Sequence, residues 1–509
     1  MASPRPARPT AFGEGISNAL NELKEKVRRL YREDNFPWVI GYSGGKDSTA
    51  VAQLVWMSLA ELPENERTKP VYVITTDTLV ENPIVAAWVE NSLQTMEAHA
   101  ASECMPFKPH LIKPDVAETF WVNLIGKGYP APRPKFRWCT ERLKIKPSSR
   151  FIQDTANEYG EVVLLLGARR AESTVRAASL NRRTASVRSE LNAHPDLPNT
   201  QVFTPIEDWS NDDVWTFLMR FPNPWGHSNK DLMSMYRGAT EDNECPVVVD
   251  TSTPSCGNSR FGCWVCTLVD QDKSMTAMIQ NDEEKEWMTP LLAFRNELDF
   301  RSSEARERDR ARRDFRRLGG HMTHYFDAHG NVKLTPGPYT QGARKEWLTR
   351  LLCIQRDIRE NPEAPAHVRN IELITLEELQ EIRRIWVAEK GEIEDYVPVI
   401  YEDVMNEPYP GKPLDEHLTF DRESLDLLRD VCGENELHYE MIRNLLNVER
   451  QYVSKAVRHG LFDDLTSTVQ RCFFADSKDA LNWYKLEKGI DDRPTGVEEQ
   501  EPEQLSLTS

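Results

Sequence analysis

The feature that most constrains this chain is a glycine-containing loop, residues 42–49, with the sequence Tyr-Ser-Gly-Gly-Lys-Asp-Ser-Thr. The apolar run 37–41 before it is typical of a short buried strand, and residues 47–62 after it carry apolar side chains at helical spacing. Two adjacent glycines let the backbone come close to a ligand, and the free N–H groups at a helix start favour an anion. The sequence therefore predicts a phosphate-binding loop at a strand-to-helix junction.

Side chains of this loop add further phosphate-binding groups. Lys46 supplies a positive charge, and the hydroxyls of Ser43, Ser48 and Thr49 supply donors. A Walker A loop requires Ser or Thr directly after its lysine, whereas Asp47 follows here, which excludes an ordinary P-loop NTPase. The alternative is a Gly-Gly turn that only starts a helix.

The pattern Ser-Gly-Gly-Lys-Asp-Ser resembles the pyrophosphate loop of the N-type ATP pyrophosphatases. That resemblance implies cleavage of ATP between its α and β phosphates, with the leaving pyrophosphate held by the loop. It also implies these ligands: Ser43, Gly44, Gly45, Lys46, Asp47 and Ser48.

Four apolar runs predict strands, at 37–41, 71–76, around 110–112 and at 161–166, and helical patterns alternate with them. This alternation predicts an α/β fold with a doubly wound parallel sheet, in which ligands lie at the carboxyl ends of the strands. Residues directly after the second and fourth strands are therefore further candidates for nucleotide binding: Asp77, Thr78, Gly167, Arg169 and Arg170. For Asp77, a role as a helix cap is the alternative.

Composition limits the kind of protein. A chain of 509 residues with 39% hydrophobic content is long enough for two or three domains with buried cores. No apolar run approaches the roughly 18 residues that span a bilayer, so we expect a cytoplasmic protein without a membrane partner.

The net charge of −18 disfavours a protein that coats nucleic acid through its overall field, while local contact with DNA stays open. The arginine-dense segment 301–317 interleaves acidic residues, which favours a solvated, salt-bridged helix face over a DNA contact.

Three further stretches follow the loop along the chain. They are 76–78 (Thr-Asp-Thr), 167–173 (Gly-Ala-Arg-Arg-Ala-Glu-Ser) and 204–215, which begins Thr-Pro-Ile-Glu-Asp-Trp-Ser. Their order and content resemble the signatures of the phosphoadenosine phosphosulfate (PAPS) reductase family, which implies a fold like that of the adenine nucleotide alpha hydrolases. The last stretch also predicts a helix capped by Ser210, and we expect its tryptophans in the core.

The cysteines form a second informative pattern. Nine cysteines without a secretion signal argue against a disulfide framework and for metal or redox use of some of them. Cys256, Cys263 and Cys266 are closely spaced, and Cys139 lies far upstream. Four thiolates suit zinc or an iron–sulfur cluster, and spacing alone does not choose between them. Cys245 is a substitute ligand, a sulfur carrier or a cysteine without chemistry.

Resemblance to the cluster-bearing sulfonucleotide reductases does choose between these metals. In those enzymes a cysteine pair in the corresponding segment ligates a [4Fe–4S] cluster; Cys139 matches one member, and Thr140 stands in place of the other. The resemblance therefore implies a [4Fe–4S] cluster, with zinc as the alternative, and the following ligands: Cys139, Cys256, Cys263 and Cys266.

The chain departs from the reductases at its end. It lacks their terminal Glu-Cys-Gly motif and adds helical patterns beyond residue 336, which suggest docking of protein or nucleic acid. With the loop and the split cysteine set, this resembles the DndC family of DNA phosphorothioation systems. The predicted segments are an N-terminal helical segment (1–36), an ATP pyrophosphatase domain like PAPS reductase (37–250), a cysteine- and arginine-rich segment (251–335), a helical region (336–488) and a disordered acidic tail (489–509).

The DndC resemblance implies an ATP-dependent sulfurtransferase that replaces a non-bridging oxygen of the DNA backbone by sulfur. ATP and Mg²⁺ would serve as cofactors, with Asp47 helping to hold the metal and Arg169 and Arg170 neutralising phosphate charge. The cluster would hold or relay sulfur, or be structural. The implied partners are DNA, a cysteine desulfurase as sulfur source and other Dnd subunits. The implied catalytic residues are Ser43, Lys46, Asp47 and Arg169.

Three alternatives stay open. A tRNA thiolation enzyme uses the same loop to adenylate a base carbonyl, and a sulfonucleotide reductase shares the family signatures. A non-catalytic ATP-binding scaffold of a DNA-modification complex is the third. Substitution of Lys46 or Asp47 separates the scaffold from the enzymes, because only an enzyme would lose pyrophosphate release.

Overall fold

The computed structural model describes residues 10–13, 15–172, 190–239, 261–318, 320–414, 422–433, 435–453, 458–471, 474 and 477–490. The chain divides into two compact units, one of Met1–Asp115 with Arg137–Asn296 and one of Val116–Phe136 with Glu297–Ser509. The two units are defined by packing, whereas the five predicted segments were defined along the sequence. The boundaries of those segments stay a prediction.

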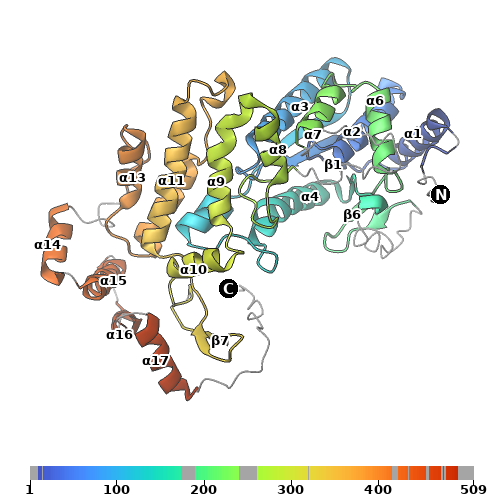
Figure 1. The fold of residues 1–509 in the computed structure, drawn as a ribbon. Helices are drawn as coiled ribbons and strands as arrows, with labels where there is room; N and C mark the ends of the chain where they lie inside the picture. Colours follow the sequence, from blue (N-terminus) through green and yellow to red (C-terminus); the bar gives the residue numbers. More distant parts are fainter. Residues whose placement is uncertain are drawn as a thin grey trace, which may run out of the picture. The chain divides into compact units, whose positions relative to one another are not determined.

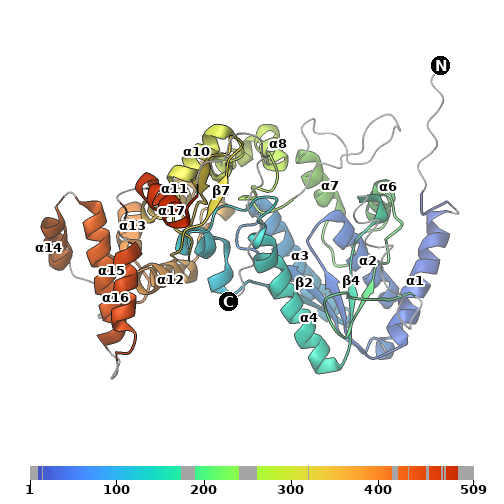
Figure 2. The same cartoon turned by 90° about the horizontal axis from the view of Figure 1, so that it is seen from below.

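A six-stranded sheet forms the centre of the first unit (Figure 2). Its strands are β1 (Trp38–Gly41), β2 (Val71–Thr76), β3 (Phe107–Ile112), β4 (Val162–Leu165), β5 (Asn192–Ala193) and β6 (Thr200–Phe203). Their order is β3-β2-β1-β4-β6-β5, and all neighbours pair in parallel except β5, which runs antiparallel to β6. The predicted α/β fold with a mostly parallel, doubly wound sheet is confirmed.

Alternating side chains along β1 build a core on each face of the sheet. Trp38 and Ile40 pack into the larger core, whereas Val39 points to the opposite face and packs with Ile152. Ile152 belongs to α4 (Lys146–Tyr159), which covers that second face (Figure 2). The helices that supply the larger core are α1 (Ile16–Arg32), α2 (Lys46–Ala60), α3 (Pro83–Ser102), α6 (Asn211–Arg220) and α7 (Asn229–Gly238).

The predicted cap and core positions around residue 210 are as expected. Ser210 accepts a hydrogen bond from the Asp213 N–H at 3.1 Å, and the Asp213 carboxylate accepts one from the Ser210 N–H at 2.8 Å, which forms a capping box. Trp209 and Trp215 are buried. Farther along the chain lie α8 (Lys273–Asn281) and α9 (Thr289–Leu298).

The second unit is mainly helical and includes a β-hairpin (Figure 1). Trp121 donates its indole N–H to the Leu373 carbonyl at 2.6 Å, and Trp386 donates to the Ile125 carbonyl at 3.0 Å, so segment 116–136 is fastened to the helical region. Its elements are α10 (Ser303–Ala311), β7 (His324–Phe326), β8 (Val332–Leu334), α11 (Gln341–Glu360), α12 (Leu376–Arg384), α13 (Tyr396–Met405), α14 (Arg422–Cys432), α15 (Glu436–Val453), α16 (Leu461–Arg471) and α17 (Ser477–Lys488).

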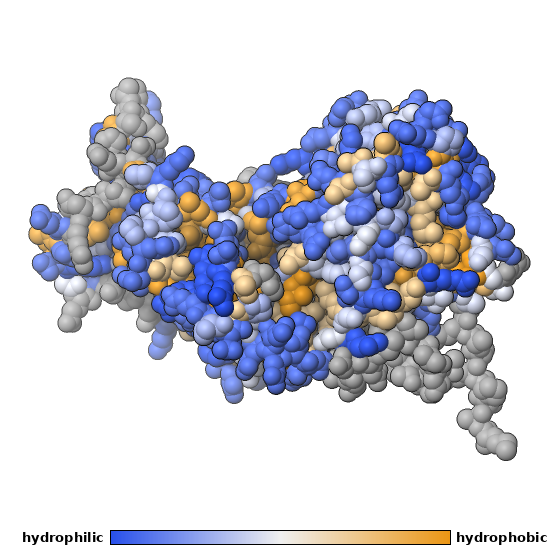
Figure 3. Space-filling model, turned by 90° about the horizontal axis from the view of Figure 1, so that it is seen from above, coloured by the Kyte–Doolittle hydropathy of each residue, from blue (hydrophilic) through white to orange (hydrophobic). Residues whose placement is uncertain are grey.

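Hydrophilic side chains dominate the face drawn in Figure 3. Among the described residues, no helix combines the length and the apolar character that crossing a bilayer would need.

Candidate functional site

The predicted phosphate loop lies between β1 and α2, and its geometry requires glycine at position 44. Gly45 is the N-cap of α2, and Gly44 has a φ of 69°, a backbone conformation that favours glycine. A Cβ atom at Gly44 would lie 2.4 Å from Cγ2 of Val89. A Cβ at Gly45 would lie 3.1 Å from the Tyr236 hydroxyl. The backbone of this loop is thus packed closely against α3 and α7, and a side chain at position 44 would collide with Val89.

Two serine side chains close the loop. The Ser43 N–H donates to Oγ of Ser48 at 3.2 Å, and Oγ of Ser48 in turn donates to the Gly45 carbonyl at 3.0 Å. The two hydroxyl oxygens lie 3.2 Å apart. These bonds fold residues 43–48 into a compact turn at the start of α2, where the helix dipole favours an anion.

A row of three charged side chains runs from the loop to the end of β4. Nζ of Lys46 lies 3.0 Å from Oδ2 of Asp47, and Nε of Arg169 donates to Oδ1 of Asp47 at 2.7 Å. Arg169 is only 3% exposed and also donates to the Trp209 carbonyl at 3.2 Å. Both carboxylate oxygens of Asp47 therefore already accept from cations, and the Arg169 guanidinium holds Asp47 in place.

Gly167 explains how β4 reaches the loop. A Cβ atom at Gly167 would lie 2.9 Å from the carbonyl carbon and oxygen of Asp47 and 3.2 Å from the Ser48 nitrogen. The backbone after β4 thus packs against the first turn of α2, and Gly167 permits this approach. Arg170, which follows, pairs with Glu207 at 3.3 Å and Asp208 at 3.1 Å.

Tyr236 of α7 contacts the loop, although sequence reasoning gave it no role. Its hydroxyl oxygen accepts a hydrogen bond from the Lys46 N–H at 3.3 Å, and its ring centroid lies 5.5 Å from Nζ of Lys46. Burial raises the pKa of Tyr236, so its hydroxyl stays protonated at neutral pH. Trp88 of α3 adds a second contact by donating its indole N–H to the Gly44 carbonyl at 3.2 Å. No motif in the sequence marks either aromatic residue.

The two candidates after β2 have different surroundings. Asp77 accepts the Leu79 N–H at 2.8 Å, and the cap of α3 is Asn82, so Asp77 stabilises a turn and is not the helix cap. Thr78 is fully buried; its hydroxyl lies 3.0 Å from Oε1 of Glu81 and 3.3 Å from Sγ of Cys263. Thr78 therefore belongs with the thiols.

Residues 78–81, 139–144 and 263–266 form a second site, here called the thiol site. Cys263 forms a β-bridge with Glu81, and the Cys266 N–H donates to the Cys263 carbonyl at 3.0 Å. Cys139 directly precedes a π-helix, Thr140–Ile145, which carries Lys144. Nζ of Lys144 lies 3.0 Å from Oε1 of Glu81. The site thus combines thiols with a carboxylate and an ammonium group.

Burial and neighbouring charges shift the pKa values of groups in the thiol site. Burial raises the pKa of Cys139, and the charge of Cys266 raises it further. Burial also raises the pKa of Cys263, with Glu81 and again Cys266 adding to the rise. Burial alone would lower the pKa of Lys144, but the charges of Cys263 and Glu81 raise it above its usual value.

The thiols provide the soft donors that an iron–sulfur cluster or zinc requires. Arg295 is buried and donates to the Cys266 carbonyl at 2.9 Å, which fixes the turn between Cys263 and Cys266. Cys256 and Cys245 lie outside the described residues, and so does Ser173. Within the part of the chain that the structure describes, no group of three or more His, Cys, Asp and Glu side chains is arranged to hold a metal ion.

Comparison with known proteins finds a family model that matches the sheet-containing part of the chain. Residues 37–268 match the model of the phosphoadenosine phosphosulfate reductase domain. An uncharacterized protein of Methanocaldococcus jannaschii is 26% identical over 200 residues, which are 39% of this chain and 35% of that protein. The chain thus spans about a third of the length of this curated relative.

Two solved structures are similar to the chain at low sequence identity. The U34-tRNA thiolase NcsA from Methanococcus maripaludis, solved with its [4Fe-4S] cluster, is 16% identical and aligns with 43% of this chain and 71% of its own at a TM-score of 0.27. The FMN adenylyltransferase of Candida glabrata, in complex with FAD and inorganic pyrophosphate, is 10% identical and aligns with 58% of this chain and 80% of its own at a TM-score of 0.25.

Proposed function

Taking residues 37–268 as a domain of the PAPS reductase family, we propose that the chain is an ATP-dependent sulfurtransferase of DNA phosphorothioation. One observation carries the proposal. The phosphate loop follows the carboxyl end of β1, and the thiol site begins just after the carboxyl end of the neighbouring strand β2. A predicted phosphate-binding loop and a set of half-buried thiols thus lie at one edge of one sheet, where α/β proteins bind their ligands.

The proposed reaction has two displacements. A non-bridging oxygen of a DNA phosphodiester attacks the α-phosphorus of ATP, and pyrophosphate leaves. A sulfur nucleophile then attacks the activated DNA phosphorus, and AMP leaves with the oxygen that the sulfur replaces. Activation is needed because an oxyanion is a poor leaving group, whereas AMP is a good one.

The loop would stabilise the pyrophosphate that leaves in the first displacement. The N–H groups at the start of α2 and the ammonium of Lys46 would stabilise the negative charge of the pyrophosphate, as preorganised donors do in phosphoryl transfer. Because both carboxylate oxygens of Asp47 accept from Lys46 and Arg169, we assign Arg169 a positioning role through Asp47. Mg²⁺ would bind chiefly through the phosphates, with Asp47 reaching it through water.

A [4Fe–4S] cluster would be held by Cys139, Cys263, Cys266 and Cys256. When bound, it would hold or relay sulfur delivered by a cysteine desulfurase. Thr78 and Glu81 would keep the Cys263 side chain oriented, since the Thr78 hydroxyl lies within 3.3 Å of that sulfur. Lys144 would balance the Glu81 carboxylate, to which it is paired at 3.0 Å. Other Dnd subunits would complete the system, in the cytoplasm.

The test is mass spectrometry of nuclease-digested DNA from the host, with the gene intact and with Cys263→Ser, to detect phosphorothioate-linked dinucleotides. We expect them with the intact gene and their loss in the variant. If none form even with neighbouring genes expressed, DNA is not the acceptor, and tRNA should then be examined for missing thiolated bases.

A second measurement separates an enzyme from a scaffold. Lys46→Met should abolish ATP-dependent pyrophosphate release by the purified chain in the presence of acceptor DNA, because the ammonium group beside the predicted pyrophosphate is gone. A chain that sustains DNA modification with this variant would be an ATP-binding scaffold.

A further inference from the structure

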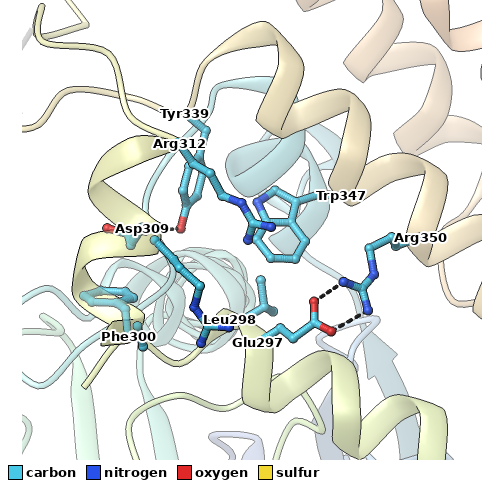
Figure 4. A pocket seen from close by; sticks show the side chains of 10 residues that line it. Glu297, Leu298, Phe300, Asp309, Arg312, Tyr339, Trp347 and Arg350 are labelled. Atoms are coloured by element: carbon cyan, nitrogen blue, oxygen red, sulfur yellow. Dashed lines mark hydrogen bonds and ion pairs between the residues drawn. The ribbon is translucent and has the colours of Figure 1, made fainter. Parts of the chain in front are cut away.

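The second unit contains a cavity that the proposed reaction does not use. Its volume is about 180 Å³, several times the roughly 30 Å³ that one water molecule occupies. Figure 4 shows the guanidinium of Arg312 lying over the indole of Trp347 on one side, and the ion pair between Glu297 and Arg350 on another. The cavity can therefore hold a group larger than water beside stacked, positively charged surfaces.

Most charges around this cavity are already paired. Arg350 is bound by Glu297, and Arg312 lies 2.7 Å from Glu346. Asp309 accepts from the Tyr339 hydroxyl at 2.7 Å and lies 3.3 Å from Nη1 of Arg313, so its charge is paired as well.

Arg308 is the exception. It lines the cavity and is exposed, and none of the described carboxylates forms an ion pair with it. It belongs to the segment 301–317, which was predicted to be a solvated, salt-bridged helix face. In the structure α10 ends at Ala311, and none of its three arginines, Arg306, Arg308 and Arg310, forms an ion pair with a described carboxylate.

The remaining walls suit a flat, electron-rich group. The Arg312 guanidinium carbon lies 4.6 Å from the centroid of the buried Trp347 ring, so Arg312 covers this indole and its guanidinium is the cationic group on this wall of the cavity. Nucleobases stack on arginine planes and on aromatic rings, and a phosphodiester pairs with a free arginine. An unpaired base with its own phosphate supplies both groups at once.

We propose that this cavity binds one nucleotide of a single-stranded nucleic acid, with the phosphodiester on Arg308 and the base against the Arg312–Trp347 stack. Because the net charge of the whole chain is −18, binding must depend on this local site. The inference extends the proposed function, since it gives an acceptor nucleic acid a site in the second unit, but it does not require the sulfur chemistry.

The test is fluorescence anisotropy of the full chain with labelled single-stranded DNA and RNA of about 16 nucleotides, over a series of salt concentrations. Arg308→Gln should weaken binding about ten-fold and lower the slope of log affinity against log salt by about 0.7, the value for one phosphate contact on a single strand. Arg308→Lys should restore the slope, because it keeps the charge.

Arg306→Gln is the matched control, because Arg306 is an exposed residue of the same helix that does not line the cavity. Equal losses in Arg306→Gln and Arg308→Gln would show only a general charge effect and would overturn the proposal. Tighter binding of duplex DNA than of single strands would overturn it too, since a paired base cannot enter. Arg308-dependent binding of RNA in preference to DNA would support the site and count against DNA as acceptor.

Failure of this inference is separable from failure of the proposed function. Arg308→Gln should leave the Kd for ATP unchanged, because the phosphate loop belongs to the other unit. If phosphorothioate never forms but Arg308-dependent binding persists, only the proposed function is lost. If phosphorothioate forms and the variant binds like wild type, only this cavity assignment is lost.

Discussion

The phosphate loop and the thiol site follow neighbouring strands of one sheet, yet they are built in different ways. The loop consists of consecutive residues, 43–48, and its shape is fixed by backbone conformation and close packing at Gly44. The thiol site draws on three separate segments, 78–81, 139–144 and 263–266, joined by side-chain contacts such as the Glu81–Lys144 pair.

This difference decides what each region tolerates. A loop made by backbone geometry fails when a Cβ atom is added, even if every charged side chain remains. A site made by side chains from distant segments fails when one donor or one charge is removed, because the others then lack a partner in a buried environment. The two regions should therefore respond to different substitutions and fail independently.

Gly44→Ala should have the largest effect. The new Cβ would meet Val89 at 2.4 Å, and a φ of 69° is strained for alanine, so the loop must move. Displacement of a binding group by about 1 Å can cost about 100-fold in rate, and we expect a loss of that size in ATP-dependent pyrophosphate release. Gly238→Ala is the control, because nothing lies within 4 Å of its added Cβ. Near-normal release in Gly44→Ala would show that the loop adapts and that its geometry is not what matters.

Substitution of the cysteines of the thiol site should remove the metal and leave pyrophosphate release intact. Cys139→Ser and Cys266→Ser should each remove most of the iron from the anaerobically purified chain, because each replaces a soft ligand by a hydroxyl. Pyrophosphate release should stay near the wild-type rate. Elemental analysis reads iron and zinc together, and Cys353→Ser, on α11 of the second unit, should leave the metal content unchanged. An iron content equal to that of the wild type in both Cys139→Ser and Cys266→Ser would show that these cysteines are not metal ligands.

The same contrast explains how far sequence reasoning could go. The strands at 37–41 and 71–76 were predicted because their apolar runs are continuous. The first residues of β3 were missed because Lys108 and Pro109 interrupt its apolar pattern. The loop was predicted because its chemistry is contiguous. Glu81 and Lys144 received no role, since only the folded chain brings them together.

Arg169 shows the same limit at the loop itself. Its place after a strand predicted contact with phosphate, but its pairing with Asp47 depends on β4 lying beside β1, an arrangement that spacing along the chain does not reveal. Tyr236 contacts Lys46 from α7, 190 residues away, and no local signal announces this.

Arg169→Met should have an intermediate effect. It leaves the Asp47 carboxylate with Lys46 alone at a site where the Arg169 side chain is 4% exposed and that of Asp47 19%. Breaking a fully buried pair costs about 3 to 5 kcal/mol, and partial exposure of Asp47 reduces our expectation to about 2 kcal/mol. Thermal unfolding should report this as a melting temperature lower by roughly 5 °C.

The neighbouring arginine supplies the control for that prediction. Arg170→Met removes more exposed pairs with Glu207 and Asp208 and should change the melting temperature little. If the two variants are equally stable while only Arg169→Met loses pyrophosphate release, Arg169 acts on phosphate and not through Asp47.

Thr78→Val should have the smallest effect, and it decides to which region Thr78 belongs. Position alone predicted nucleotide binding, but the buried hydroxyl contacts Glu81 and Cys263. Loss of this hydroxyl should cost about 1 kcal/mol of stability and alter the absorption of the metal site, while the Kd for ATP stays unchanged. Thr76→Val is the control, because its hydroxyl contacts Ser148 at 2.8 Å and not the thiols. Weaker binding of ATP by Thr78→Val, but not by Thr76→Val, would instead show that Thr78 contacts the nucleotide. The phosphate loop and the thiol site would then not be independent at Thr78, the thiol-site residue that is nearest to the loop in sequence.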